Sequence, residues 1–200
     1  MKKSNVNFLK PSQEQLNSLL KYYQTGQYVD AEKLSLSITK EFPEHLFAWK
    51  VLAVALKENG KISQSLVASQ KSVQLSLQDS ESHNNLGVTL KKIGRLEEAE
   101  ASYRQAIKFK PDYAEAHNNL GNVLQIKEKL EEAEASYRQA IKFKPDYAEA
   151  HNNLGITLQT LGKLEEAEAS YRQAIKFKPN YAEAHNNLGN VLQTLEQLEE

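Results

Sequence analysis

The chain has 200 residues, of which 40% are apolar and 26% charged, enough for one soluble folded unit with a sizeable core. Its 25 basic and 26 acidic residues are interspersed and give a net charge of -1, which argues against nucleic acid as a partner. The absence of cysteine excludes disulfides, thiolate metal ligands and cysteine nucleophiles, and it favours a cytoplasmic protein. No apolar run is long enough for a signal peptide or a membrane-spanning helix, so we expect no membrane partner.

A period of 34 residues divides the chain. We predict an N-terminal extension over residues 1–11 and a helical solenoid over residues 12–200, made of the units 12–45, 46–79, 80–113, 114–147, 148–181 and a partial unit 182–200. The units 114–147 and 148–181 differ at only six positions, whereas the first two units keep little more than small and apolar positions such as Gly26, Gly60 and Pro43.

Each unit carries two apolar patterns of helical spacing, separated by a break near Gly162 and ended by a proline such as Pro179. Glu128 and Glu196 stand where the other units have glycine, so we expect Gly162→Glu to cost little stability. An acceptor followed three residues later by glutamate predicts capping boxes at the restarts, at Asp112–Glu115, Asp146–Glu149 and Asn180–Glu183.

These units resemble the tetratricopeptide repeat. The family pattern of bulky, small and aromatic positions is met by His117, Leu120, Gly121, Ala133, Tyr137, Ala140 and Pro145. The resemblance implies an all-α fold, a right-handed superhelical solenoid of antiparallel helix pairs. Gly121 and Ala133 are expected to let the two helices of a unit approach closely.

Two units depart from this pattern. The second has Ser65, Ser69 and Ser72 at small or aromatic positions, which makes its packing the weakest prediction. The sixth ends where a second helix would begin, so we expect Leu188, Leu192 and Leu195 to be partly exposed and to favour self-association.

The face of each first helix opposite its apolar side is the candidate binding site. Its polar members are Asn85, Asn119, Asn122, Asn153, Asn187, Asn190, Glu115 and Glu149. The family places this face in the inner groove of the superhelix. The asparagine before Leu-Gly in each unit resembles the asparagine ladder in the superhelical arm of O-linked N-acetylglucosamine transferases, which holds the backbone of extended peptides. The alternative is that these are solvated asparagines copied by duplication; in either case we expect alanine there to leave melting almost unchanged.

The histidines in register, His83, His117, His151 and His185, do not form a metal site, because zinc ligands lie about 2.0–2.1 Å from one ion while packed helices are about 8–10 Å apart. We expect imidazoles in the core, beside the buried tyrosines Tyr103, Tyr137 and Tyr171. The basic residues Arg104, Lys108, Lys110 and their equivalents end the second helices, where cations suit the helix dipole; a phosphate site is the alternative.

No glycine-rich phosphate loop, metalloprotease motif or nucleophile elbow occurs, and the adjacent glutamates such as Glu97 and Glu98 do not face each other. We therefore predict a non-enzymatic scaffold that uses no cofactor and binds a protein or an extended peptide. The alternative is the substrate-recruiting arm of a glycosyltransferase, sulfotransferase or methyltransferase. Binding of RNA is disfavoured by the neutral charge. Glu115, Asn118 and Asn119 stand where related modules place the basic side chains of a carboxylate clamp, so no clamp is expected.

Overall fold

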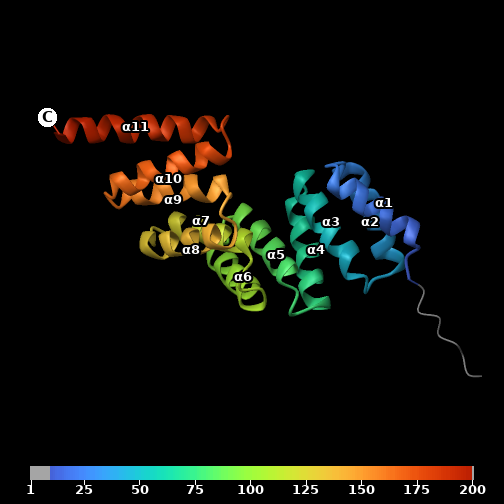
Figure 1. Cartoon of the computed structure of the whole chain (residues 1–200). Coiled ribbons are helices and arrows are strands. Elements are labelled where there is room, and N and C mark those ends of the chain that lie inside the picture. Colours follow the sequence, from blue (N-terminus) through green and yellow to red (C-terminus); the bar gives the residue numbers. More distant parts are fainter. Residues whose placement is uncertain (1–9, 200) are drawn as a thin grey trace, which may run out of the picture. The chain divides into compact units, whose positions relative to one another are not determined.

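The computed structural model describes residues 10–199, and the regular structure in this range is entirely α-helical (Figure 1). The helices are α1 (Gln13–Gln24), α2 (Tyr28–Glu41), α3 (Leu46–Glu58), α4 (Ile62–Leu75), α5 (Ser80–Lys92), α6 (Leu96–Phe109), α7 (Ala114–Ile126), α8 (Leu130–Phe143), α9 (Ala148–Thr160), α10 (Leu164–Phe177) and α11 (Ala182–Glu199). The all-α prediction is confirmed. None of the described helices is long and apolar enough to cross a membrane.

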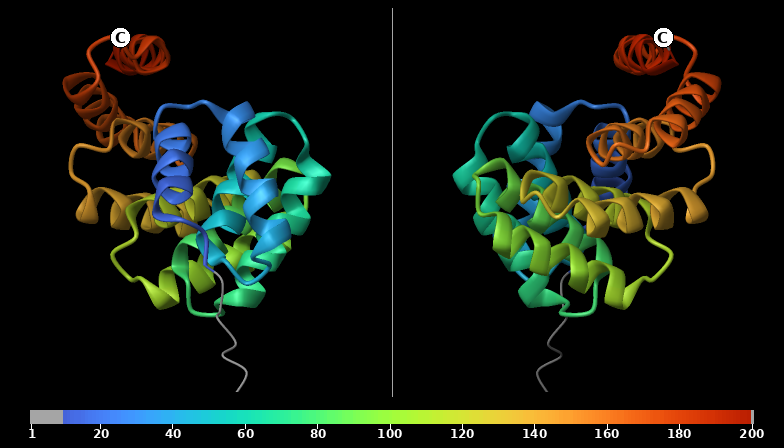
Figure 2. Two further views of the ribbon diagram at one scale, coloured as in Figure 1. Left: turned by 90° about the vertical axis from the view of Figure 1, so that its right-hand side faces the viewer. Right: turned by 90° about the vertical axis from the view of Figure 1, so that its left-hand side faces the viewer.

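The chain divides into two compact units, Met1–Gly94 with α1 to α5 and Arg95–Glu200 with α6 to α11. In each unit the helices follow one another in chain order and are joined by short turns (Figure 2). Every helix packs against the next within its unit, and alternate helices such as α3 and α5, or α7 and α9, also touch. A single continuous solenoid over residues 12–200 stays a prediction.

The core of the first unit is apolar around α1, α2 and α3 and polar around α4. Leu19, Ile38 and Val51 lie in the first part, at 0% to 2% exposure. In α4 the Ser65 hydroxyl donates to the carbonyl oxygen of Ala53 at 2.7 Å, and Ser72 donates to that of Ser69 at 2.8 Å. The serines are therefore buried with partners, and the second repeat forms both of its helices in spite of them.

In the second unit the core is built on close contacts between a glycine of one helix and a tyrosine of the next. A Cβ atom placed on Gly121 in α7 would lie 2.6 Å from Cε1 of Tyr137 in α8, and one on Gly155 would lie 2.5 Å from Cε1 of Tyr171. Both tyrosines are fully buried. The expected close approach at Gly121 is thus confirmed, and its partner is an aromatic ring.

The turns inside the repeats require a left-handed residue. Gly26, Gly60, Gly94 and Gly162 have φ between 70° and 78°, and Glu128 is the one described non-glycine residue with positive φ, at 58°. A side chain in this region costs about 1–2 kcal/mol because Cβ approaches the following carbonyl oxygen. The expectation that Gly162→Glu costs little is therefore wrong, since Glu128 is itself strained.

Replacing Glu128 with glycine is expected to raise the free energy of unfolding by about 0.5–1 kcal/mol. Relief of the left-handed strain exceeds the entropy that glycine adds to the unfolded chain, which is about 0.4–1 kcal/mol. Urea unfolding should show a higher midpoint with an unchanged slope. Gly162→Glu is the reciprocal control and should shift the midpoint downward by a similar amount; an unchanged midpoint in both variants would contradict the turn geometry.

The predicted turn at Glu196 does not form. α11 runs without a break through this position to Glu199. At Glu128 the turn is followed by α8, which packs on α7, whereas no such helix follows Glu196 in this chain, so no tertiary contact offsets the left-handed strain there. As expected, Leu188, Leu192 and Leu195 are only half-buried, while the equivalent Leu154 and Leu158 are 4% and 1% exposed.

Two predicted capping boxes are also wrong. α7 and α9 begin after Tyr113 and Tyr147, and neither N-cap side chain makes a capping hydrogen bond. The turn that follows each proline takes up one residue more than the spacing suggests, so the aspartates lie just outside the helices. Side-chain capping occurs instead in the first unit, as a capping box of Ser12 with Gln15.

Candidate functional site

The candidate site of the second unit lies on α7, α9 and α11, on the side away from the buried leucines. We call it the amide face and define it by Asn118, Asn119, Asn122, Gln125, Asn152, Asn153, Gln159 and Asn187. Each of these helices touches the next along the face. Asn118 and Asn152 are buried at 4% and 0% exposure, while Asn153 and Asn187 are half-buried.

Hydrogen bonds between repeats fix the orientation of the ladder asparagines. Nδ2 of Asn153 donates to Oδ1 of Asn118 at 3.2 Å and to Oδ1 of Asn122 at 3.0 Å. In the same way, Nδ2 of Asn187 donates to Oδ1 of Asn152 at 3.1 Å. These donors support the stacking of repeats, so the expectation that alanine would leave melting unchanged needs correction: each lost bond should cost about 0.5–1.5 kcal/mol.

The other half of each ladder amide remains available. Oδ1 of Asn153 and Oδ1 of Asn187 accept no hydrogen bond from the described residues and are not buried. Because the amide is planar, an oxygen whose nitrogen is tied to the preceding repeat points away from that bond. The amide face therefore presents acceptors at these two positions.

The core tyrosines stabilise the same face from below. The Tyr137 hydroxyl donates to Oδ1 of Asn122 at 2.8 Å and to Oε1 of Gln125 at 2.9 Å, and that of Tyr171 donates to Oε1 of Gln159 at 2.9 Å. Burial raises the pKa of Tyr171 to about 12, so the phenol stays a donor at neutral pH. The predicted core role of these tyrosines extends to ordering the amides above them.

Asn85 in the first unit differs from its equivalents. Its Nδ2 is buried without a hydrogen-bond partner in the described residues, beside a cavity of about 10 Å³ lined also by Ala53, Ser69 and Thr89. One repeat upstream, Lys50 stands where the later repeats have asparagine, and it pairs with Asp79 and Glu81. The amide ladder has no upstream acceptor here, so Asn85 offers a different surface from Asn153.

The predicted acidic members of the site are placed along the same helices. Glu115 is half-buried and pairs with Lys144 at 3.3 Å, while Glu149 is exposed and makes no ion pair in the described range. Glu183 accepts from Nδ2 of Asn152 at 3.4 Å. Asn190 is exposed on α11, and Asn119 is half-buried on α7.

The histidines act as structural links. Nε2 of His117 lies 2.9 Å from the carbonyl oxygen of Pro111, and His151 repeats this contact with Pro145. Both rings are 8% exposed, which confirms the core interpretation, whereas His185 is exposed. Burial lowers the pKa of His151 and favours a neutral ring. Among the described residues no group of histidines and carboxylates could hold a metal ion.

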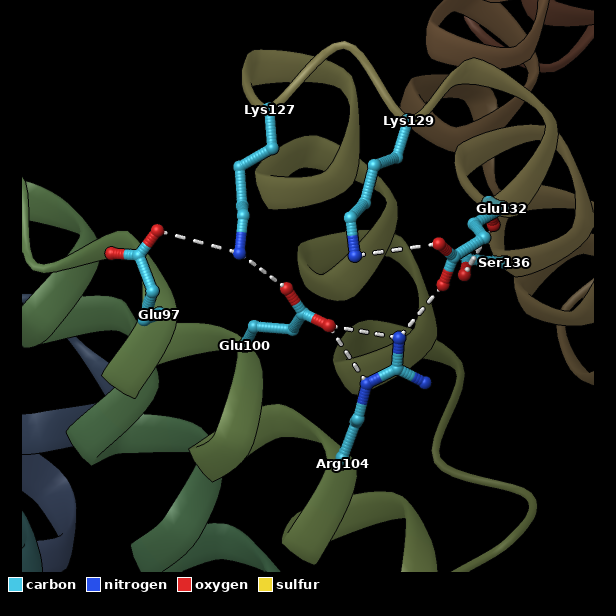
Figure 3. Close-up of polar contacts among 7 residues, drawn as sticks. All are labelled: Glu97, Glu100, Arg104, Lys127, Lys129, Glu132 and Ser136. Carbon is cyan, nitrogen blue, oxygen red and sulfur yellow. Dashed lines mark hydrogen bonds and ion pairs between the residues drawn. The ribbon is translucent and has the colours of Figure 1, made fainter.

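A network of ion pairs links successive second helices, and the sequence interpretation missed it (Figure 3). Arg104 of α6 reaches Glu100 of its own helix and Glu132 of α8, each at 2.9 Å, and Lys127 reaches Glu100 at 2.8 Å. A hydrogen bond from Lys127 holds the pKa of Glu100 below its ordinary value. Arg138 repeats the pattern with Glu134 and Glu166. The signal that could have revealed it is the recurring separation of 28 residues between arginine and glutamate.

The lysines of the second-helix ends lie over aromatic rings. Nζ of Lys144 is 4.5 Å from the ring centroid of Tyr147, and Nζ of Lys178 is 4.4 Å from that of Tyr181. Lys142 lies 5.7 Å from the Phe143 centroid in the same manner. These cation–π contacts give the lysines a structural partner, and the phosphate-site alternative gains no support from them.

A family model described as TPR repeat matches three stretches, residues 89–127, 126–162 and 160–195, which together span more than half of the chain. The chain belongs to the tetratricopeptide-repeat family. No curated protein sequence matches this tetratricopeptide-repeat protein.

Solved structures resemble the protein over most of its length. TTC0263, a thermophilic TPR protein of Thermus thermophilus, is 25% identical with a TM-score of 0.73, covering 90% of this chain and 98% of its own. YrrB, a TPR protein with an unusual peptide-binding site, is 16% identical with a TM-score of 0.67, covering 88% and 91%. The first TPR of Spaghetti, bound to an HSP90 peptide, is 26% identical with a TM-score of 0.58, covering 60% and 94%.

Proposed function

We propose that this tetratricopeptide-repeat protein is a non-catalytic scaffold that binds an extended peptide or partner segment in a concave groove lined by the amide face. The observation that carries the proposal is the pair of accessible acceptors, Oδ1 of Asn153 and Oδ1 of Asn187, held in one orientation by bonds to the preceding repeat. Rigid acceptors at repeat spacing suit the N–H groups of an extended backbone, because such contacts ignore the side chains of the ligand.

The solved relatives support a peptide ligand. The first TPR of Spaghetti holds an HSP90 peptide, and YrrB has a peptide-binding site of its own. The likeness of the asparagine positions to the transferase arm is part of the same proposal. The alternative, a recruiting arm of a larger transferase, stays a prediction about residues outside this chain.

Deleting the ladder amides is expected to lower peptide affinity by an order of magnitude or more. The variant Asn119→Ala, Asn153→Ala, Asn187→Ala removes up to three backbone contacts, each contributing about 0.5–1.5 kcal/mol. The probe is a pool of dodecapeptides selected by display on the parent chain, and binding is measured by fluorescence polarisation. Circular dichroism must show that the variant is folded, because we expect a moderately lower melting temperature from the lost bonds between repeats.

A matched control removes three exposed amides from the second helices, Gln105, Gln139 and Gln173, by the same substitution. It should leave affinity unchanged. Equal losses in both triple variants, or no loss in the ladder variant, would place recognition elsewhere. Failure of the display to enrich any peptide would count against the proposal directly.

The amide face has no carboxylate clamp, so the free carboxyl terminus of a ligand should not matter. The peptide Ser-Arg-Met-Glu-Glu-Val-Asp is expected to bind equally well as free acid and as amide, because the clamp positions hold Glu115, Asn118 and Asn119. Isothermal titration with both forms measures the difference. A clear preference for the free acid would contradict this prediction.

Self-association through α11 stays part of the proposal. Leu198 is 72% exposed, and Leu188 and Leu192 are half-buried beside it on the same helix. A concentration series in light scattering should show growth in apparent mass. A constant monomer mass would remove this element and leave peptide binding untouched.

A further inference from the structure

The amide face is one-sided in its hydrogen bonding. The nitrogens of Asn153 and Asn187 are bonded to the preceding repeat, and their oxygens are accessible without a donor in the described residues. A free asparagine offers both a donor and an acceptor to a ligand, but these two offer only the acceptor. A partner must therefore bring donors to them.

A carboxylate accompanies each of these oxygens. Glu149 precedes Asn153 by four residues in α9, and Glu183 precedes Asn187 by four residues in α11. Residues at this separation are neighbours on one helix surface, about 5–6 Å apart between Cβ atoms. Both glutamates are exposed. The same arrangement of an acceptor amide and a carboxylate thus occurs in two consecutive repeats.

The cations nearest in the fold neutralise this arrangement incompletely. Lys144 pairs with Glu115 at 3.3 Å and lies over the Tyr147 ring. Lys178 is the repeat equivalent of Lys144, but it lies over the Tyr181 ring and forms no ion pair with Glu149 within 4.0 Å. Glu183 has the neutral Asn152 amide as its partner. Negative charge therefore remains at Glu149 and Glu183.

We propose that the amide face selects basic segments, and that each pair Glu149–Asn153 and Glu183–Asn187 receives an arginine or lysine side chain of an extended partner. This rests on the proposed function, because it names the partner class of the same face. Arginine suits the pairs best: its planar guanidinium has five donors and can bond a carboxylate and an amide oxygen together. The preference is opposite to that of a clamp for a carboxyl terminus.

Three dodecapeptides of one serine and proline framework test the proposal, carrying arginine, citrulline or glutamate at the same alternate positions. Citrulline keeps the shape of arginine and removes its charge. An exposed ion pair strengthens binding by up to about fivefold, so two repeats should favour arginine over citrulline by on the order of tenfold at low salt. The glutamate peptide should bind most weakly, and added salt should reduce the arginine advantage.

The matched variants remove two charges each and preserve side-chain size. Glu149→Gln with Glu183→Gln should bring the arginine peptide to the affinity of the citrulline peptide. Glu131→Gln with Glu165→Gln, at exposed positions of the second helices without ion pairs in the described range, should leave the arginine advantage intact. Binding is measured by fluorescence polarisation over a salt series.

Equal binding of all three peptides, or equal effects of the two double variants, would overturn the selection of basic segments. If the triple asparagine variant then still weakens all three peptides, the peptide-binding proposal survives without the charge preference. Preferential binding of the glutamate peptide, or binding of none of the three, would overturn the inference, and the display-selected pool would decide the proposed function separately.

Discussion

Replacing Gly121 with leucine is expected to lower the free energy of unfolding by about 3 kcal/mol or more, the upper range for overpacking. Even the first added atom has no room, because a Cβ at Gly121 would lie 2.6 Å from Cε1 and 2.8 Å from Cδ1 of Tyr137. The ring cannot turn aside cheaply, since it is fully buried and its hydroxyl is tied to Asn122 and Gln125. Gly121→Ala should already cost about 1–3 kcal/mol, measured by urea unfolding.

Gly189 provides the control within the same chain. It is the equivalent of Gly121 in α11, but a Cβ there would meet nothing within 4 Å. Gly189→Ala should therefore stabilise by about 1 kcal/mol through helix propensity alone. Two identical substitutions at equivalent positions are thus expected to have opposite signs. Stabilisation by Gly121→Ala would show that the tyrosine does not pack against this glycine.

The helices and their order follow from the sequence because each depends on local information. The apolar spacing within a unit, the glycine at the turn and the proline after the second helix all act over a few residues, and α3 to α10 appear where this pattern predicts. The positions of Gly121 and Tyr137 on packed faces follow in the same way. Local patterns also placed the ladder asparagines on one face.

Contacts between repeats could not be predicted in the same way. The bond from Asn153 to Asn118 joins residues 35 apart, one more than the period, so it depends on how far one repeat is displaced against the next. That displacement is a property of packing, and it decides whether an amide is free or bonded. The available oxygen and the bonded nitrogen of Asn153 are therefore indistinguishable in the sequence.

Tertiary context also explains the errors at the turns. Glu128 and Glu196 have the same place in their repeats, yet one is in a left-handed turn and the other is inside a helix. The glutamate accepts strain only where α8 follows and packs on α7. Sequence equivalence predicted two turns, and the presence of a packed second helix determined which one forms.

The second large effect concerns the pair formed by Gly121 and Tyr137. Tyr137→Ser is expected to cost about 3–5 kcal/mol, as for the loss of a buried aromatic ring. The second repeat already contains the opposite combination, since Ala53 and Ser69 stand at the equivalent positions and Ser69 is fully buried. A small residue replaces the ring there, and a methyl group replaces the glycine hydrogen.

Combining Gly121→Ala with Tyr137→Ser should therefore cost less than the sum of the single changes, by about 1–3 kcal/mol. Without the ring, the new methyl group no longer clashes and fills part of the space that the tyrosine leaves. Urea unfolding of the parent, the two single variants and the double variant gives the coupling energy. Gly189→Ala combined with Tyr137→Ser is the control, and it should be additive because Gly189 has no neighbour within 4 Å. Additivity in both pairs would mean that the glycine and the tyrosine of a repeat are chosen independently.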